Sequence, residues 1–150
     1  MTDVSFYHLQ RSSLESVLPK LLERTLAGGK RAVVMAGSDA RVRALNGLLW
    51  TYDPASWLPH GSAAEGDGAD HPVWLTTSDE NPNAATYLFL TDGAEPSKID
   101  GFERCFDLFD GNDPTSLAAA RGRWKACQDA GHALTYWQQS PEGRWEEKKG

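Results

Sequence analysis

The feature that most constrains the fold is an uninterrupted apolar run from Ala32 to Ala36, which stands between two segments with helical periodicity. Successive side chains of a β-strand point to opposite faces of its sheet. A strand that is apolar throughout must therefore be covered on both faces, which is typical of parallel sheets packed between helices. The run predicts a buried strand in a sheet of this kind.

The rest of the chain alternates strand patterns with helix patterns. Short β-prone runs predict strands, and apolar residues at intervals of three and four predict helices. We expect strands at residues 4–9, 32–36, 73–76, 86–90, 104–109 and 133–138, an edge strand at 144–146, and helices at about 14–26, 39–49 and 114–130. The fold class that follows is α/β, a three-layer αβα arrangement with a mostly parallel sheet of Rossmann-like or P-loop-like topology.

Local signals indicate where the helices begin. A capping-box pattern starts the first helix at Ser12, and Pro19 predicts either a kink or a later start near Leu18. Ser38 or the following residue is expected to cap the second helix. The pair Asp113-Pro114 has the pattern of an N-cap followed by proline at the first helical position, so it starts the third helix.

The chain of 150 residues has the usual length of one domain, and we expect residues 1–150 to form it. Small polar residues predict a flexible loop at about 61–72, and the charged end predicts a frayed tail at about 146–150. No apolar run reaches 18 residues, and the N-terminus lacks the pattern of a secretory signal. With two cysteines and no CxxC pair, a cytoplasmic protein without a membrane segment is expected.

The known catalytic motifs are missing. A net charge of −6 disfavours strong nucleic-acid binding by the surface as a whole, because phosphate contacts need basic side chains. Residues 27–31, AGGKR, lead from a helix into a strand, whereas a P-loop leads from a strand into a helix. The histidines and cysteines have no metal-ligand spacing. The sequence therefore predicts no catalytic residue, metal site or cofactor.

The third predicted helix combines an apolar stripe with basic side chains. At 100° per residue, the stripe consists of Leu117, Ala120, Trp124 and Cys127. Arg121 and Lys125 fall side by side on one border of the stripe, and Arg123 falls beyond the other. Such charges usually form a solvated helix face. The alternative is a docking site for an anionic ligand with an apolar end.

The segment from residue 47 to residue 66 carries a more specific pattern. It reads GLLW at 47–50, DPASWLPH at 53–60 and AEG at 64–66. This arrangement resembles the chi subunit of bacterial DNA polymerase III, whose pattern is roughly Leu-Trp, an aromatic residue, a Pro-His pair and a loop of small residues. Weaker agreement comes from FYHL at 6–9, GKRAVV at 29–34, RGRWKA at 121–126 and TYWQQ at 135–139. The resemblance covers nearly the whole chain.

Chi proteins are adaptors of the clamp-loader assembly with no known catalysis, so the resemblance implies a non-catalytic protein. One surface of the family binds the acidic C-terminal tail of single-stranded-DNA-binding protein. A second binds the psi subunit, in lineages that have one, and a helicase-like partner competes for it. By position, Arg121 matches the arginine central to tail binding, Trp50 the tryptophan near that pocket and Lys125 a lysine of the same basic surface. Arg123 and Trp124, which adjoin them on the third helix, complete the expected tail site.

The second surface of the family corresponds here to Trp57, Leu58 and Pro59. Leu117 departs from some relatives, which have lysine there, so the basic patch is thinner in this chain. The alternative function is a small nucleotide- or nucleic-acid-processing α/β enzyme with a dispersed site. A deep pocket with an empty acidic cluster at the carboxyl edge of the sheet would favour that enzyme. A purely structural subunit, with no affinity for an isolated tail peptide, is a third possibility.

Overall fold

The structure, a computed structural model, describes residues 2–52, 60–62, 68, 71–94, 96, 99, 101–142 and 144–148. Within these residues the strands form an eight-stranded sheet in the order β3-β4-β2-β5-β6-β1-β7-β8. The elements are β1 Asp3–Leu9, α1 Leu14–Ala27, β2 Ala32–Met35, α2 Asp39–Thr51, β3 Gly61–Ser62, β4 Val73–Thr76, β5 Tyr87–Leu90, β6 Arg104–Asp110, α3 Pro114–Asp129, β7 Ala133–Gln139 and β8 Trp145–Lys148.

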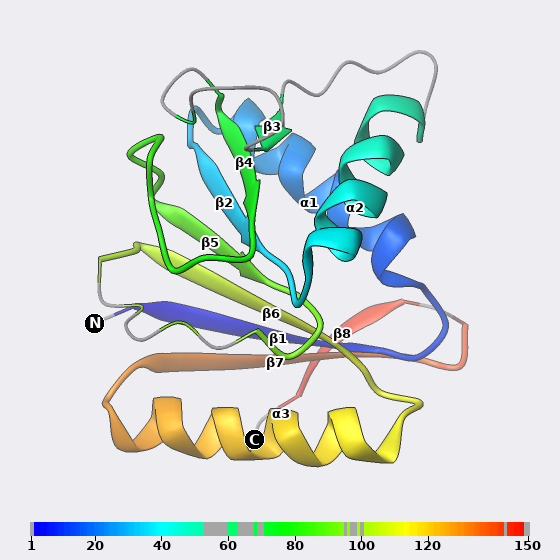
Figure 1. Ribbon diagram of the computed structural model, residues 1–150. Coiled ribbons are helices and arrows are strands. Elements are labelled where there is room, and N and C mark those ends of the chain that lie inside the picture. The colour runs from blue at the N-terminus through cyan, green and yellow to red at the C-terminus, as the bar shows by residue number, and fades with distance from the viewer. Residues whose placement is uncertain are drawn as a thin grey trace.

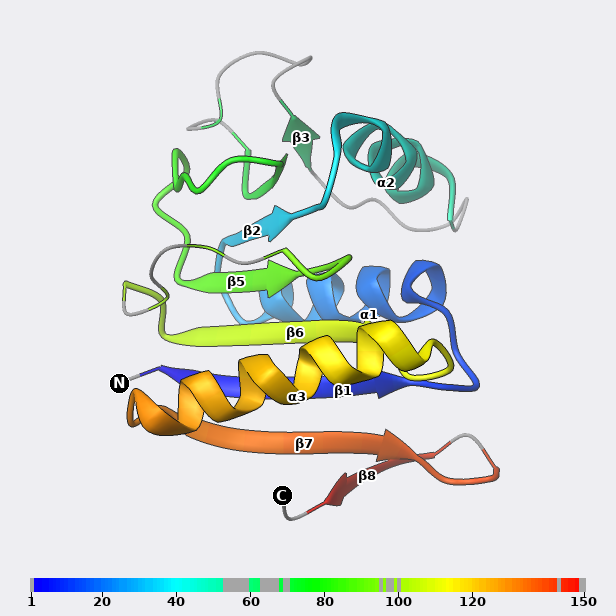
Figure 2. The ribbon, with the colours of Figure 1, turned by 60° about the horizontal axis from the view of Figure 1, so that its bottom comes forward.

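The sheet is parallel except at one edge, where β8 pairs with β7 in the antiparallel direction. Helices α1 and α2 cover one face of the sheet, and α3 covers the other (Figures 1 and 2). Right-handed crossovers explain this division, because the chain moves in one direction along the sheet from β1 to β2 and in the opposite direction from β6 to β7. The predicted αβα fold class with a mostly parallel sheet is confirmed.

Two layers of apolar side chains separate the sheet from its helices. Val33 and Val34 of β2 belong to different layers and are 1% and 0% exposed, as an apolar strand between two helical layers requires. On the α1 and α2 side, Phe89 and Phe106 stack with their ring centroids 4.4 Å apart. On the α3 side, the layer includes Phe6 from the central strand β1. The opening interpretation of residues 32–36 is thus confirmed.

The start of α1 differs from its prediction. Ser13 rather than Ser12 caps the helix, because the Ser13 hydroxyl oxygen accepts a hydrogen bond from the backbone N–H of Ser16 at 3.2 Å. The helix begins at Leu14 and includes Pro19, so the later start was wrong. Pro19 is buried, and this packing helps to offset the backbone hydrogen bond that proline cannot donate. The caps of α2 and α3, Ser38 and Asp113, are as predicted.

Two segments predicted to be irregular contain strands. The tail was expected to fray from residue 146, but β8 runs to Lys148 because its backbone pairs with residues 136–139 of β7. In the predicted flexible loop at 61–72, residues 61 and 62 pair with β4 as β3. Residues 63–67, 69 and 70 of that loop lie outside the described part of the chain.

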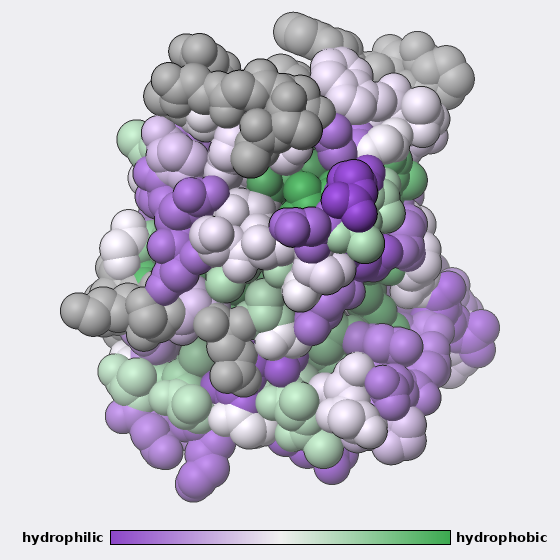
Figure 3. Space-filling view, in the orientation of Figure 1, coloured by the Kyte–Doolittle hydropathy of each residue, from purple (hydrophilic) through white to green (hydrophobic). Residues whose placement is uncertain are grey.

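On the face of the molecule seen in Figure 3, hydrophilic residues are interspersed with hydrophobic groups, some of them along the lower edge occupied by α3. None of the described helices is long and apolar enough to cross a bilayer.

Candidate functional site

Helix α3 lies across β6, β1 and β7 and is anchored there by its apolar stripe (Figure 2). Ala120 is 3% exposed, and the half-buried Trp124 contacts two rings of the sheet. Its ring centroid lies 5.2 Å from that of Phe6 and 5.7 Å from that of Tyr136, both in edge-to-face geometry. The predicted stripe is confirmed, and it fixes which side of α3 borders β7.

A cavity of about 260 Å³ opens along that side, and we call it the α3 cavity. The described residues that line it come from α3, β6, β7 and β8. They are Phe109, Leu117, Ala120, Arg121, Trp124, Tyr136 and Lys148. Five of these are apolar or aromatic and two are cationic, so the cavity suits a ligand with an apolar group and negative charge.

A hydrogen bond beneath the α3 cavity holds one of its aromatic walls. The Tyr136 hydroxyl lies 2.5 Å from Nδ1 of His8, which is 6% exposed. Burial lowers the pKa of His8 and raises the pKa of Tyr136, so both side chains are neutral at pH 7. Gly111 makes room for this arrangement, since a Cβ at that position would overlap the His8 ring. The floor of the cavity is therefore a rigid, uncharged aromatic surface.

The two cations of the α3 cavity stand on different elements. Arg121 is exposed on α3, where its aliphatic stem borders the apolar stripe and its guanidinium reaches solvent. Lys148 projects from β8 directly across the ladder from Tyr136. Lys125 is exposed one helical turn after Arg121 and does not line the cavity. An anion bound here would meet positive charge from both walls.

Arg123, the other basic residue expected in the tail site, does not line the α3 cavity. It lies on the opposite side of α3, where its guanidinium donates two hydrogen bonds to Asp107 of β6, with distances of 2.6 and 3.0 Å. The side chains of the pair are 10% and 4% exposed. The helical wheel placed Arg123 beyond the far border of the stripe, but only the sheet beneath it could reveal the carboxylate. The pair ties α3 to the sheet.

Trp50, which the resemblance placed near the tail pocket, does not line the α3 cavity. It lies in the last turn of α2, on the opposite face of the sheet from α3. Trp50 is 53% exposed, and its ring centroid lies 4.5 Å from that of His60. The predicted second surface, Trp57, Leu58 and Pro59, lies outside the described residues. In sequence, however, Trp50 and His60 flank that segment.

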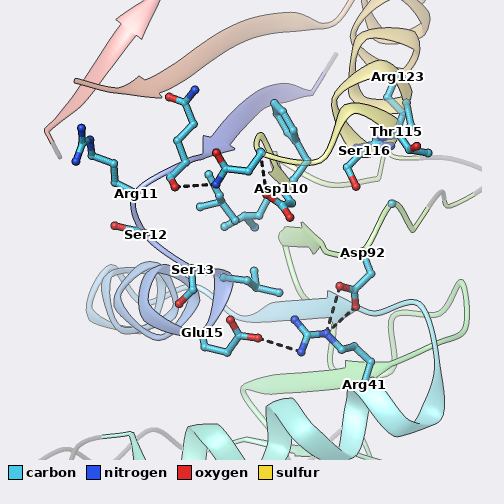
Figure 4. Close-up of a pocket in the computed structure, with 18 residues that line it drawn as sticks. Arg11, Ser12, Ser13, Glu15, Arg41, Asp92, Asp110, Thr115, Ser116 and Arg123 are labelled. Atoms are coloured by element: carbon cyan, nitrogen blue, oxygen red, sulfur yellow. Dashed lines mark hydrogen bonds and ion pairs between the residues drawn. The ribbon is translucent and has the colours of Figure 1, made fainter. Parts of the chain in front are cut away.

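A larger cavity, of about 850 Å³, lies at the carboxyl edge of the sheet between the ends of β1 and β6 (Figure 4). Helices leave these neighbouring strands toward opposite faces, and α/β enzymes bind ligands at such a switch point. Arg41, however, pairs with both Glu15 at 3.0 Å and Asp92 at 3.1 Å. The pocket required by the enzyme alternative is present, but one arginine neutralises two of the three acidic side chains among its described lining residues.

The described residues also give little support to nucleophilic or metal chemistry. Burial raises the pKa of Cys105 and of Cys127, which keeps both thiols protonated at neutral pH. Among the residues that the structure describes, no cluster of three or more His, Cys, Asp or Glu side chains could hold a metal ion. Both cysteines contribute to the apolar layer under α3, as small core residues.

Sequence reasoning missed three residues of the α3 cavity. Phe109 and Tyr136 belong to strands that were predicted, but strand patterns do not show which helix will cover a side chain. Lys148 was assigned to a frayed tail, so it had no predicted position at all. The Ser140-Pro141 turn favours a hairpin with the preceding strand, but residues 145–148, WEEK, carry no alternation that shows how far its second strand extends.

Comparisons with known proteins bear on what this surface does. Residues 1–135 match the family model described as DNA polymerase III chi subunit, HolC. The chain is 27% identical over 99 residues to the probable DNA polymerase III subunit chi of Rickettsia prowazekii. This alignment covers 66% of this chain and 60% of that protein. It is 27% identical over 137 residues to the DNA polymerase III subunit chi of Pseudomonas aeruginosa. That alignment covers 89% of this chain and 94% of the relative.

The family match extends over most of the sheet, all three helices and the segment that first suggested a resemblance. Chi is a non-catalytic accessory subunit of the replicative polymerase, which agrees with the paired carboxylates at the switch point. The earlier resemblance is confirmed: the chain belongs to the DNA polymerase III chi subunit family.

Proposed function

We propose that the protein is a cytoplasmic adaptor that binds the acidic C-terminal tail of single-stranded-DNA-binding protein and links it to the clamp-loader assembly. The observation that carries this proposal is the α3 cavity, an apolar hollow with a cation on each of two walls. The tail of the family's partner ends in acidic residues, an aromatic residue and a free carboxylate. Each of these groups has a complementary surface in the cavity.

The terminal carboxylate is assigned to Arg121, because a guanidinium can donate two parallel hydrogen bonds to a carboxylate. The aromatic ring enters the hollow between Leu117 and Tyr136, where Trp124 supplies an edge. A tail that becomes ordered on binding loses conformational entropy, so a modest affinity is expected. A modest affinity allows the tail to dissociate quickly, which suits an adaptor that must release its partner as replication proceeds.

The first test is a titration of the protein with a fluorescently labelled tail peptide at two salt concentrations. Removing the terminal aromatic residue of the peptide should weaken binding about tenfold or more, since burial of a large apolar side chain contributes roughly 1.5–3 kcal/mol. Higher salt should also weaken binding, because rim charges are screened over about 8–10 Å. Equal affinity of the full and shortened peptides would rule out the α3 cavity as the tail site.

We further propose that the psi subunit, in a lineage that has one, docks at the end of α2, where a helicase-like partner would compete with it. Support comes from Trp50, the one large apolar side chain that is exposed among the described residues. Exposed aromatics are common interface anchors. Trp50 adjoins the segment that holds Trp57, Leu58 and Pro59, which the family resemblance assigned to this partner.

Substituting Trp50 or Trp57 with alanine should weaken this second interaction while leaving the fold intact. We expect a change in unfolding free energy below about 1 kcal/mol, because surface side chains contribute little to stability. The measurement is chemical denaturation together with a binding assay for purified psi. A loss of about 3 kcal/mol or more would instead identify the tryptophan as a core residue. Tail-peptide binding, which uses the other face, should not change.

A further inference from the structure

A second hollow, of about 360 Å³, continues the α3 cavity along the helix. It is lined by Trp124, Gln128, His132, Leu134, Thr135, Glu147 and Lys148. The two hollows share Trp124 and Lys148, so they are successive parts of one depression between α3 and the β7–β8 hairpin. We call this depression the α3–β8 groove. In Figure 2, β7 runs beside α3 and β8 lies at the outer edge of the sheet.

The two parts of the groove differ in chemistry. The part formed by the α3 cavity has Phe109, Leu117 and Tyr136 in its walls, which suit an aromatic ring. The second part is lined by the polar side chains Gln128 and Thr135, by His132 and by the carboxylate of Glu147. A peptide whose terminal aromatic residue occupies the first part would therefore place its preceding residues over the shared Trp124–Lys148 boundary and into the more polar part.

Lys148 is well placed at that boundary. Its side chain is 50% exposed, and its neighbour Glu146 lies 3.8 Å away, at the outer limit of an ion pair. So weak and exposed an ion pair contributes little to stability, and Lys148 can readily exchange Glu146 for another carboxylate. Backbone pairing with Tyr136 fixes the position of Lys148 along the groove. The groove thus has one cation on the α3 side and another on the β8 side.

Strand β8 lies beyond the family match, which ends at residue 135. The outer wall of the groove therefore lies outside the matched segment. We propose that Lys148 is a positioning residue for the tail: its ammonium group binds the acidic residues that precede the terminal aromatic residue, so β8 lengthens the stretch of tail that the protein holds. This inference rests on the proposed function of the α3 cavity.

The test compares Lys148→Ala with the wild-type protein against two labelled peptides. One is the acidic tail, and the other has its acidic residues before the aromatic replaced by the corresponding amides. Lys148→Ala should bind the acidic tail about three- to tenfold more weakly, the scale of one partly exposed charged contact. It should bind the amide peptide as the wild type does. Lys20→Ala, an exposed lysine of α1 on the other face, is the matched control.

The outcomes separate this inference from the proposed function. If Lys148→Ala binds the acidic tail as tightly as wild type while Arg121→Ala does not, the role of β8 is overturned and the tail site stands. An equal loss for both peptides would also overturn it, because the lysine would then act through the fold and not through the acidic residues. If neither variant affects binding, the proposed tail site itself fails. Circular dichroism and melting temperature check that each variant is folded.

Discussion

Arg121→Ala should bind the acidic tail peptide roughly tenfold to a hundredfold more weakly than the wild type. One bidentate, charge-assisted contact between a guanidinium and a carboxylate contributes about 1.5–3 kcal/mol, which corresponds to that range. The stem of Arg121 borders the apolar stripe while its head group is exposed, so the substitution removes the contact without opening the core. The measurement is a fluorescence titration at low and moderate salt.

Arg43→Ala is the matched control for Arg121→Ala. Arg43 is likewise exposed on a helix, but α2 covers the opposite face of the sheet. It loses the same charge far from the α3 cavity, so its affinity for the tail should remain within about twofold of wild type. If Arg121→Ala binds the tail peptide as tightly as the wild type, Arg121 and Lys125 are part of a solvated helix face and not of a docking site.

Asp107→Ala is expected to lower the unfolding free energy by about 3–5 kcal/mol. The substitution leaves the Arg123 guanidinium, which is 10% exposed, without the carboxylate that accepts two of its hydrogen bonds. Leaving a buried charge without its main partner lowers the unfolding free energy far more than breaking an exposed ion pair does. Because the pair joins α3 to β6, its loss should also loosen the helix that carries Arg121. Urea denaturation followed by tryptophan fluorescence measures the effect.

Two comparisons isolate the cause. Glu103→Ala breaks the exposed Lys30–Glu103 pair, whose side chains are 39% and 53% exposed, and should cost no more than about 1 kcal/mol. The double variant Asp107→Leu with Arg123→Met replaces the whole pair by apolar side chains and should recover much of the lost stability. If Asp107→Ala and Glu103→Ala cost the same, burial of the pair does not matter.

The two proposed docking surfaces lie on opposite faces of the sheet. The α3 cavity belongs to the face covered by α3, and Trp50 belongs to the face covered by α1 and α2. A peptide on one face would not obstruct a folded partner on the other. This separation is what a linking subunit needs, and it predicts that the tail peptide and psi bind at the same time.

Much of the fold followed from local patterns. The apolar run from Ala32 to Ala36 required a strand covered on both faces, and the caps at Ser38 and Asp113 set the starts of two helices. These features depend on neighbours within one turn or one strand, so the sequence alone contains them. The stripe on α3 and the position of Arg121 on its border were predicted for the same reason.

Tertiary structure decided which residues lie close together. Arg123 shares a helix with Arg121, but Asp107 lies beneath it on β6, and the ion pair removes it from the surface. Trp50 stands on the other face because the direction of each crossover determines the face that its helix covers. Lys148 enters the α3 cavity only because β8 pairs with β7. All three outcomes depend on contacts between residues distant in sequence, which periodicity and spacing along a single chain do not contain.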